Sequence, residues 1–165
     1  MTIRKNSKSS PRDLRSWRQA LGRLGEDLAA EHLEALGYSI LDRNWRNGRL
    51  CELDLIARDP DCVLAFVEVK TRCAPEGALA DSCQSAIEAV GPAKRRRIRT
   101  AAFAWLSQYR ADCRAESDPA FKSLRFDLVV VTIEGSDLVT GSGGGSLLMA
   151  DGTGASILHV PAAFF

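Results

Sequence analysis

The sequence is poor in the residues that link small folds through disulfides or metals. It has two histidines and five cysteines, at positions 51, 62, 73, 83 and 113, and no C-x-x-C pair. Neither a zinc site nor a disulfide framework is therefore indicated. We expect reduced thiols, because Cys62 and Cys83 lie among apolar or small residues and can serve as small hydrophobic side chains. A chain of 165 residues can bury a core without such links.

Long apolar runs are also absent. No segment approaches the roughly 20 consecutive apolar residues that a membrane-spanning helix requires. The N-terminal segment is basic and polar and is not followed by an apolar stretch, so it is not typical of a secretory signal. We therefore expect a cytoplasmic protein without a membrane partner. The glycine-rich segment 141–146 is not followed by Gly-Lys-Ser/Thr, which favours a plain flexible loop over a phosphate-binding loop.

Positive charge is present but unevenly distributed, although the formal net charge is only +1. The segment up to Arg23 is basic and contains a single acid, Asp13. A second basic run contains Lys94, Arg95, Arg96, Arg97 and Arg99. Clustered Lys and Arg side chains can neutralise phosphates, so both segments are candidate nucleic-acid contacts. The alternative is a solubilising tail and a solvated helix face.

The hydrophobic pattern predicts a single domain over 18–165 after a basic, disordered tail at 1–17, which lacks periodic apolar residues. Apolar residues at helical spacing predict a helix over 20–36, with Gly37 as its stop signal. Strands are predicted at 38–45, 51–57, 62–70, 124–133 and 156–160, the first three forming an antiparallel meander. A helical stretch over 78–109 is predicted to break near Gly91-Pro92. This order predicts an α/β fold in which helices flank a mixed sheet.

One group of residues on the second and third predicted strands can carry chemistry. Residues two apart on a strand face the same side, so we expect Glu52 to point with Asp54, and Glu68 with Lys70. If these strands pair through the turn at 59–61, Asp54 and Glu68 can converge on one cation. Glu52 is equally suited to closing the site or to facing solvent. The spacing alone is weak evidence, because acids and lysines alternate with apolar residues on any half-exposed strand.

Such an arrangement suits the hydrolysis of a phosphodiester. Magnesium favours carboxylate, carbonyl and water oxygens, and Asp54, Glu68 and the Val69 carbonyl can supply part of its shell. Lys70 can orient a water molecule or stabilise charge that develops on phosphorus. Glu26, on the first predicted helix, is a further candidate ligand.

Several short motifs occur together in a recognisable order. They are Gly22-Arg-Leu-Gly25-Glu26, Ala29-Ala30, Gly37-Tyr38, Asn44-Trp45-Arg46, Glu52-Leu-Asp54-Leu-Ile56-Ala57, Phe66-Val-Glu68-Val-Lys70-Thr-Arg72, the run Lys94 to Arg97, and Arg125-Phe-Asp127. By these motifs, residues 20–134 resemble the YraN-like family of uncharacterised proteins, and the segment 159–164 resembles that family's C-terminal end. The family in turn looks like a relative of the PD-(D/E)xK nucleases, in particular of the archaeal Holliday-junction resolvases.

The resemblance implies a restriction-endonuclease-like core and an endonuclease that cleaves structured or branched DNA with Mg²⁺ or Mn²⁺. It implies that Glu26 is the helix acid, Asp54 the metal aspartate, Glu68 the second acid and Lys70 the catalytic lysine. One departure is Cys51, where the family usually has glycine, and a side chain there is expected to crowd the backbone beside the site. Because cutting a junction needs two symmetric incisions, an active enzyme is expected to be a homodimer.

Two other functions fit the same residues. The first is a non-catalytic nucleic-acid-binding or adaptor protein that keeps the nuclease fold and depends on its basic run rather than on its acids. The second is a partner-binding protein whose acids form an internal salt bridge with Lys70. Cleavage and its loss on substitution of Asp54 distinguish the enzyme from both, and affinity for DNA at physiological salt distinguishes the adaptor from the partner-binding protein.

Overall fold

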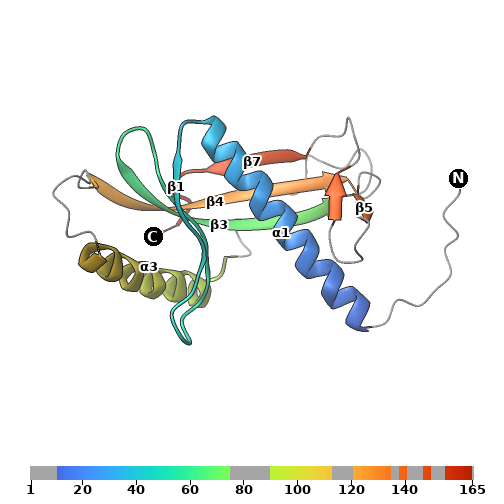
Figure 1. The fold of residues 1–165 in the computed structure, drawn as a ribbon, viewed down its shortest axis with the longest axis horizontal. Helices are drawn as coiled ribbons and strands as arrows, with labels where there is room; N and C mark the ends of the chain where they lie inside the picture. The colour runs from blue at the N-terminus through green and yellow to red at the C-terminus, as the bar shows by residue number, and fades with distance from the viewer. Residues whose placement is uncertain are drawn as a thin grey trace, which may run out of the picture.

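The computed structural model describes residues 11–74, 90–112, 121–134, 138–140, 147–149 and 155–164. These residues form a five-stranded mixed sheet with a helix on each face (Figure 1). The predicted α/β architecture of a mixed sheet flanked by helices is therefore confirmed. The predicted loop at 141–146 and the first part of the predicted helical stretch, at 78–89, lie outside the described residues.

Helix α1 (Pro11–Ala35) begins earlier than the sequence predicted. Proline suits the first position of a helix, because its missing N–H would have no partner there. The long Arg and Gln side chains that follow are good helix formers. The prediction of a disordered tail is therefore wrong for residues 11–17, whereas residues 1–10 lie outside the described part. The buried face of α1 starts only at Leu21, which explains why apolar periodicity did not reveal the first turns.

Gly37 ends α1 as predicted. Its φ of 86° lies in the left-handed region that glycine adopts without strain. The amide of Tyr38 donates to the carbonyl of Leu33 at 3.0 Å, and the amide of Gly37 donates to that of Glu34 at 2.9 Å. This pair of bonds is a Schellman cap, which satisfies the last carbonyls of the helix and turns the chain into the sheet.

The strand order in the sheet is β1-β2-β3-β4-β7. The strands are β1 (Ser39–Trp45), β2 (Leu53–Arg58), β3 (Val63–Ala74), β4 (Ser123–Glu134) and β7 (Ser156–Val160). The first three form the predicted antiparallel meander, β4 runs parallel to β3, and β7 is antiparallel to β4. Two short strands, β5 (Leu138–Thr140) and β6 (Leu147–Met149), form a separate antiparallel pair.

The alternation of side chains along β3 divides the core into two clusters. On one face, Phe66 packs with buried residues of α3 (Pro92–Asp112), among them Ile98. On the other face, Val67 packs with α1 residues such as Leu33. Figure 1 shows the two helices on different sides of the sheet, with α1 crossing the strands obliquely. We call these the α3 face and the α1 face.

Helix α3 begins at Pro92, where the second predicted helical piece was expected to begin, whereas the piece before it lies outside the described residues. Proline is again at the first helical position, where no hydrogen bond is lost. Within the described ranges, no helix combines the length and apolar character needed to cross a membrane.

Candidate active site

The acids predicted on β2 and β3 lie side by side. The pairing of these strands runs from Arg58 with Leu64 to Leu55 with Val67. Just beyond that last pair, Oδ2 of Asp54 accepts a hydrogen bond of 2.8 Å from the backbone amide of Val69. The bond holds Asp54 against β3 next to Glu68, as the strand register predicted.

Glu68 is the buried centre of the site, on the α3 face, with 3% of its surface exposed. Its Oε1 accepts a hydrogen bond of 2.5 Å from Nζ of Lys70, two residues along the same strand. The same oxygen also accepts a hydrogen bond from Nζ of Lys94, at the start of α3. One carboxylate oxygen is therefore shared by two ammonium groups, and Lys94 belongs to this site rather than to a solvated basic surface.

The surroundings of Asp54 disfavour its charged form. Burial and the neighbouring charge of Glu68 raise its pKa from 3.8 to about 7, against the opposing effects of the Val69 amide and of Lys94. Burial by itself would lower the pKa of Lys94, but the hydrogen bond to Glu68 and the charges of Glu68 and Asp54 together more than offset burial and raise that pKa. Shifts of this kind, caused by desolvation together with a specific charged partner, cluster at functional sites.

Glu26 lies on α1 and is bonded to the side chain of Asn44. Burial raises the pKa of Glu26, and the charge of Glu52 adds to the effect. Across the described residues, no three His, Cys, Asp or Glu side chains converge as a metal-binding group. The structure thus pairs Asp54 with Glu68 but does not bring Glu26 into a three-carboxylate cluster with them.

Gly25 allows α1 to approach the sheet closely beside this site. A Cβ atom at position 25 would overlap the hydroxyl oxygen of Thr71. Thr71 directly follows Lys70, so the contact fixes α1 against the part of β3 that carries the site. The glycine before Glu26 is therefore required by the close packing of helix and strand.

The two residues just before β2 have separate surroundings. Glu52 forms an ion pair with Arg46, and the expectation that it points with Asp54 stays a prediction. Cys51 packs against the core of the α3 face, and burial raises the pKa of its thiol. The Cys51 side chain thus fills space beside the site.

The basic run at 94–99 divides between the protein interior and its surface. Besides Lys94, whose ammonium group bonds Glu68, Arg95 is held by the protein: its Nε donates to the carbonyl of Val90 at 2.6 Å, and its guanidinium lies 5.8 Å from the ring centre of Phe164. The exposed members are Arg96, Arg97 and Arg99. Within this run, these three side chains are exposed and can contact a phosphate directly.

A second polar cluster, on the α1 face, was not predicted. The carboxylate of Asp127 is fully buried and accepts hydrogen bonds from Nε of Arg125 at 3.0 and 3.1 Å. Nε2 of His159 lies 3.0 Å from its Oδ2, and the amide of Ala162 donates to its Oδ1 at 3.0 Å. The motif Arg125-Phe-Asp127 was a signal for this cluster. Spacing along the sequence does not reveal the partner His159, because it lies 32 residues after Asp127.

Arg125 extends this cluster across the sheet. Its Nη1 donates to Asp59 at 2.8 Å and its Nη2 donates to the Tyr38 hydroxyl at 2.6 Å. Asp59 in turn accepts the amide of Val63 at 2.8 Å. No buried side-chain nitrogen or oxygen in the described ranges lacks a hydrogen-bond partner. This second cluster is therefore fully satisfied and structural in character.

The fold and the site together define an α/β protein in which two carboxylates and two lysines meet between adjacent strands and a helix. The model of uncharacterised protein family UPF0102 matches residues 25–131, and the chain belongs to this family. A UPF0102 protein of Mycobacterium sp. (strain JLS) is 43% identical over 117 residues, covering 70% of this chain and 76% of the relative. A UPF0102 protein of Acidothermus cellulolyticus is 44% identical over 119 residues, covering 70% and 83%. No solved structure matches the chain.

Proposed function

We propose that this chain is a magnesium-dependent endonuclease that acts on structured or branched DNA. The observation that carries the proposal is the pairing of Asp54 with Glu68 beside Lys70, together with the raised pKa of Asp54. The antiparallel meander followed by a parallel fourth strand, with a helix on each face, supports a PD-(D/E)xK core. The order of the sequence motifs supports the same assignment.

The donor set fits a hard divalent cation. Burial and, after it, the charge of Glu68 raise the pKa of Asp54, and a cation between the two carboxylates would favour their charged forms. Magnesium commonly binds through one or two carboxylates and keeps waters and substrate phosphates as its other ligands. A site with two converging carboxylates and the Val69 carbonyl is therefore sufficient, and Glu26 stays a prediction from the resemblance.

Each residue of the site has a distinct role in this proposal. Asp54 and Glu68 would hold the cation, which when bound polarises the phosphoryl oxygen and lowers the pKa of a coordinated water. Lys70 is kept at the acids by its 2.5 Å bond to Glu68, where its ammonium can orient the water or stabilise charge on phosphorus. Lys94 counters the charge of Glu68, and it becomes available to a phosphate when Glu68 binds a cation.

One observation favours the alternative of a non-catalytic nucleic-acid-binding or adaptor protein. Lys70 and Lys94 both bond the same oxygen of Glu68, so that the acid is neutralised within the protein. An adaptor would keep this ion pair permanently and would bind DNA through the exposed Arg96, Arg97 and Arg99. It predicts binding that is insensitive to Asp54→Asn and sensitive to removal of those arginines.

Cleavage of a labelled panel of DNA tests the proposal. Single-stranded, duplex, flapped and four-way-junction DNA would be incubated with Mg²⁺ or Mn²⁺ and with the intact protein, Asp54→Asn or Lys70→Ala. We expect cutting of branched DNA that falls about a hundredfold or more in both variants. Asp54→Asn keeps an oxygen that can accept the Val69 amide, so it removes charge with little change of shape.

The matched control is Asp61→Asn, which removes an exposed acid from the turn before β3. Its cleavage should equal that of the wild type. Cutting that persists in Asp54→Asn and Lys70→Ala would be due to a contaminating nuclease and would contradict the proposal. Binding without cutting under every condition would support the adaptor instead.

A further inference from the structure

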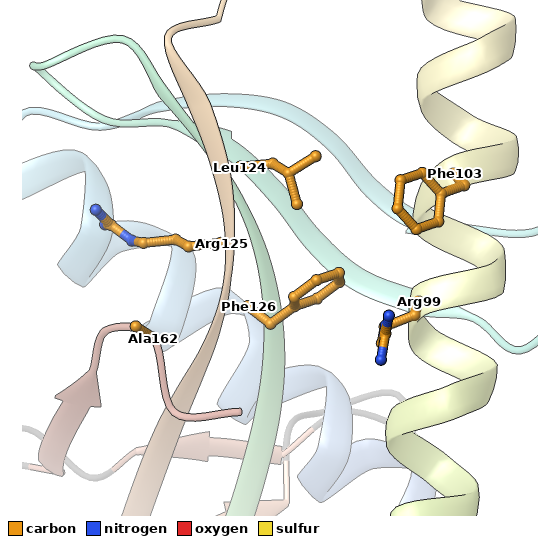
Figure 2. Close-up of a pocket in the computed structure, with 6 residues that line it drawn as sticks. All are labelled: Arg99, Phe103, Leu124, Arg125, Phe126 and Ala162. Carbon is orange, nitrogen blue, oxygen red and sulfur yellow. The ribbon is translucent and has the colours of Figure 1, made fainter. Parts of the chain in front are cut away.

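A pocket of about 220 Å³ lies between α3 and the start of β4 (Figure 2). Its lining includes Phe103 and Arg99 from α3 and Leu124 and Phe126 from β4. Figure 2 shows the Phe103 ring and the Leu124 side chain facing one another across the opening, with Phe126 between helix and strand. We call it the Phe103 pocket. It is smaller than the 300–1,000 Å³ or so of pockets that take drug-sized ligands, and its size suits a single ring system.

Two of the apolar side chains that line the pocket are largely exposed to solvent. Phe103 is 53% exposed and Leu124 is 38% exposed, whereas Phe126 below them is 6% exposed. A half-exposed aromatic ring opposite an aliphatic side chain offers an apolar surface on which a flat ring can lie. Phe103 therefore differs from the aromatic residues of the α3-face core, which pack against one another.

The charged side chains around the pocket indicate which kind of ligand would carry the ring that it binds. At 100° per residue, the exposed side chains of Arg96, Arg99, Phe103 and Arg110 lie within one arc of about 60° on α3. The guanidinium groups of Arg96 and Arg99 form no ion pair with any described residue. Exposed arginine side chains before and after an exposed aromatic ring on one side of a helix match a phosphate chain that carries flat bases.

We propose that the Phe103 pocket binds one unstacked base of single-stranded DNA while Arg96, Arg99 and Arg110 contact the flanking phosphates. The inference rests on the proposed function and adds to it a single-stranded segment as part of the substrate. A base leaves its stack at flaps, junction arms and single strands, so the pocket selects such DNA over intact duplex.

The position of the pocket relative to the acids fits a continuous strand. Lys94 bonds Glu68 at the start of α3, and Phe103 is nine residues further along, roughly 14 Å at 1.5 Å per residue. This distance is short enough for one single strand of a few nucleotides to span. The pocket can therefore hold a base of the same strand whose phosphate lies at Glu68 and Asp54.

Equilibrium binding without metal tests the pocket independently of cleavage. Fluorescence anisotropy would compare a 12-nucleotide oligo(dT), an abasic strand of equal length and a blunt duplex, using the full chain in EDTA. The wild type should prefer oligo(dT) to the abasic strand. Phe103→Ala should weaken binding to oligo(dT) about tenfold and abolish that preference, because base–aromatic stacking is lost. Phe103→Trp should retain the preference.

Two controls separate stacking from charge and from folding. Arg96→Ala should weaken binding to both single strands equally and reduce the slope of log affinity against log salt by about 0.7. Leu36→Ala removes another apolar side chain, in the turn just after α1, that is 50% exposed, and it should leave DNA binding unchanged. Thermal unfolding of Phe103→Ala should match that of the wild type.

Three results would overturn the inference. The first is a wild type that binds the abasic strand as well as oligo(dT). The second is a Phe103→Ala variant that keeps the preference. The third is a Phe103→Ala variant that sediments differently from the wild type but binds DNA equally well. That result would assign the pocket to a contact with a second copy of the chain. None of these depends on cleavage, so a protein that does not cut DNA can still pass the test, and an active nuclease can fail it.

Discussion

The two faces of the sheet each carry a polar cluster, and the two clusters differ in how completely their charges are matched. On the α1 face, the buried carboxylate of Asp127 lies between Arg125, His159 and the amide of Ala162. On the α3 face, Glu68 is bonded by lysines, while Asp54 lies beside it with a single backbone donor and a pKa raised to about 7. In the first cluster the buried carboxylate is fully matched by donors and opposite charges, whereas in the second the carboxylate of Asp54 is not.

The difference indicates which of the two clusters can gain free energy by binding a ligand. A buried acid that is surrounded by donors stabilises one arrangement and has little to offer a ligand. Two acids that repel one another gain free energy from any cation that comes between them. The same sheet therefore contains one polar cluster whose buried acid is matched by donors and one in which two acids lie side by side, as the proposed cation site requires.

The largest predicted effect is the loss of Asp127. Asp127→Ala leaves Arg125 and His159 partly buried without their acid, and we expect the free energy of unfolding to fall by about 3–5 kcal/mol. Urea unfolding followed by circular dichroism measures this. Asp61→Ala, an exposed acid, should change the value by less than about 0.5 kcal/mol. Equal effects for the two would contradict the contrast between the clusters.

The second effect is steric and acts on the placement of α1 beside the site. Gly25→Ala forces a methyl group into Thr71, and we expect a loss of about 3 kcal/mol because helix and strand cannot both keep their positions. Gly22→Ala is the matched control, since nothing lies within 4 Å of a Cβ there. It should stabilise the protein by up to about 1 kcal/mol. Similar melting temperatures for the two would show that the close approach is absent.

The third effect is a stabilisation. The pKa of Asp54 is about 7 in the folded chain against an ordinary 3.8, so between these pH values the folded state holds a proton that the unfolded state has lost. Stability contributed by this group therefore falls as pH rises through that window. Asp54→Asn should be more stable than the wild type by about 2 kcal/mol at pH 8, with the difference vanishing near pH 4. Thermal unfolding across pH, without metal, checks this, and a constant difference would contradict it.

The smallest effect concerns an ion pair outside both clusters. Arg43 and Asp27 lie 2.6 Å apart with side chains 42% and 62% exposed. Solvent screens such a pair, so Asp27→Ala should lower the free energy of unfolding by less than about 0.5 kcal/mol. Added salt should reduce this difference further. An effect comparable to that of Asp127→Ala would mean that the burial of an ion pair does not determine how much its loss destabilises the protein.

Local pattern was enough to predict most of the sheet and half of the site. Alternation along β3 placed Glu68 and Lys70 on one side, and the turn before β3 indicated the pairing that brings Asp54 next to them. These relations depend on residues two apart or on one hairpin-like connection, which the sequence displays directly.

The rest depends on contacts that sequence spacing does not display. Lys94 was assigned to a basic surface, yet it reaches Glu68, because the direction in which α3 crosses the sheet decides which cation points inward. Asp127 and His159 meet only because β7 pairs with β4. The start of α1 was missed because residues 14–19 are exposed and carry no apolar periodicity.

Residues 159–164, at the end of β7 and just after it, are held on both sides of the sheet. His159 and the amide of Ala162 bond Asp127 on one side of the sheet, while the buried ring of Phe164 stacks on Phe126 on the other. Detaching this short stretch would break contacts on both sides in a single event. Amide hydrogens of β4 and of the first turn of α3 should therefore exchange with solvent at a common rate, as one cooperative unit.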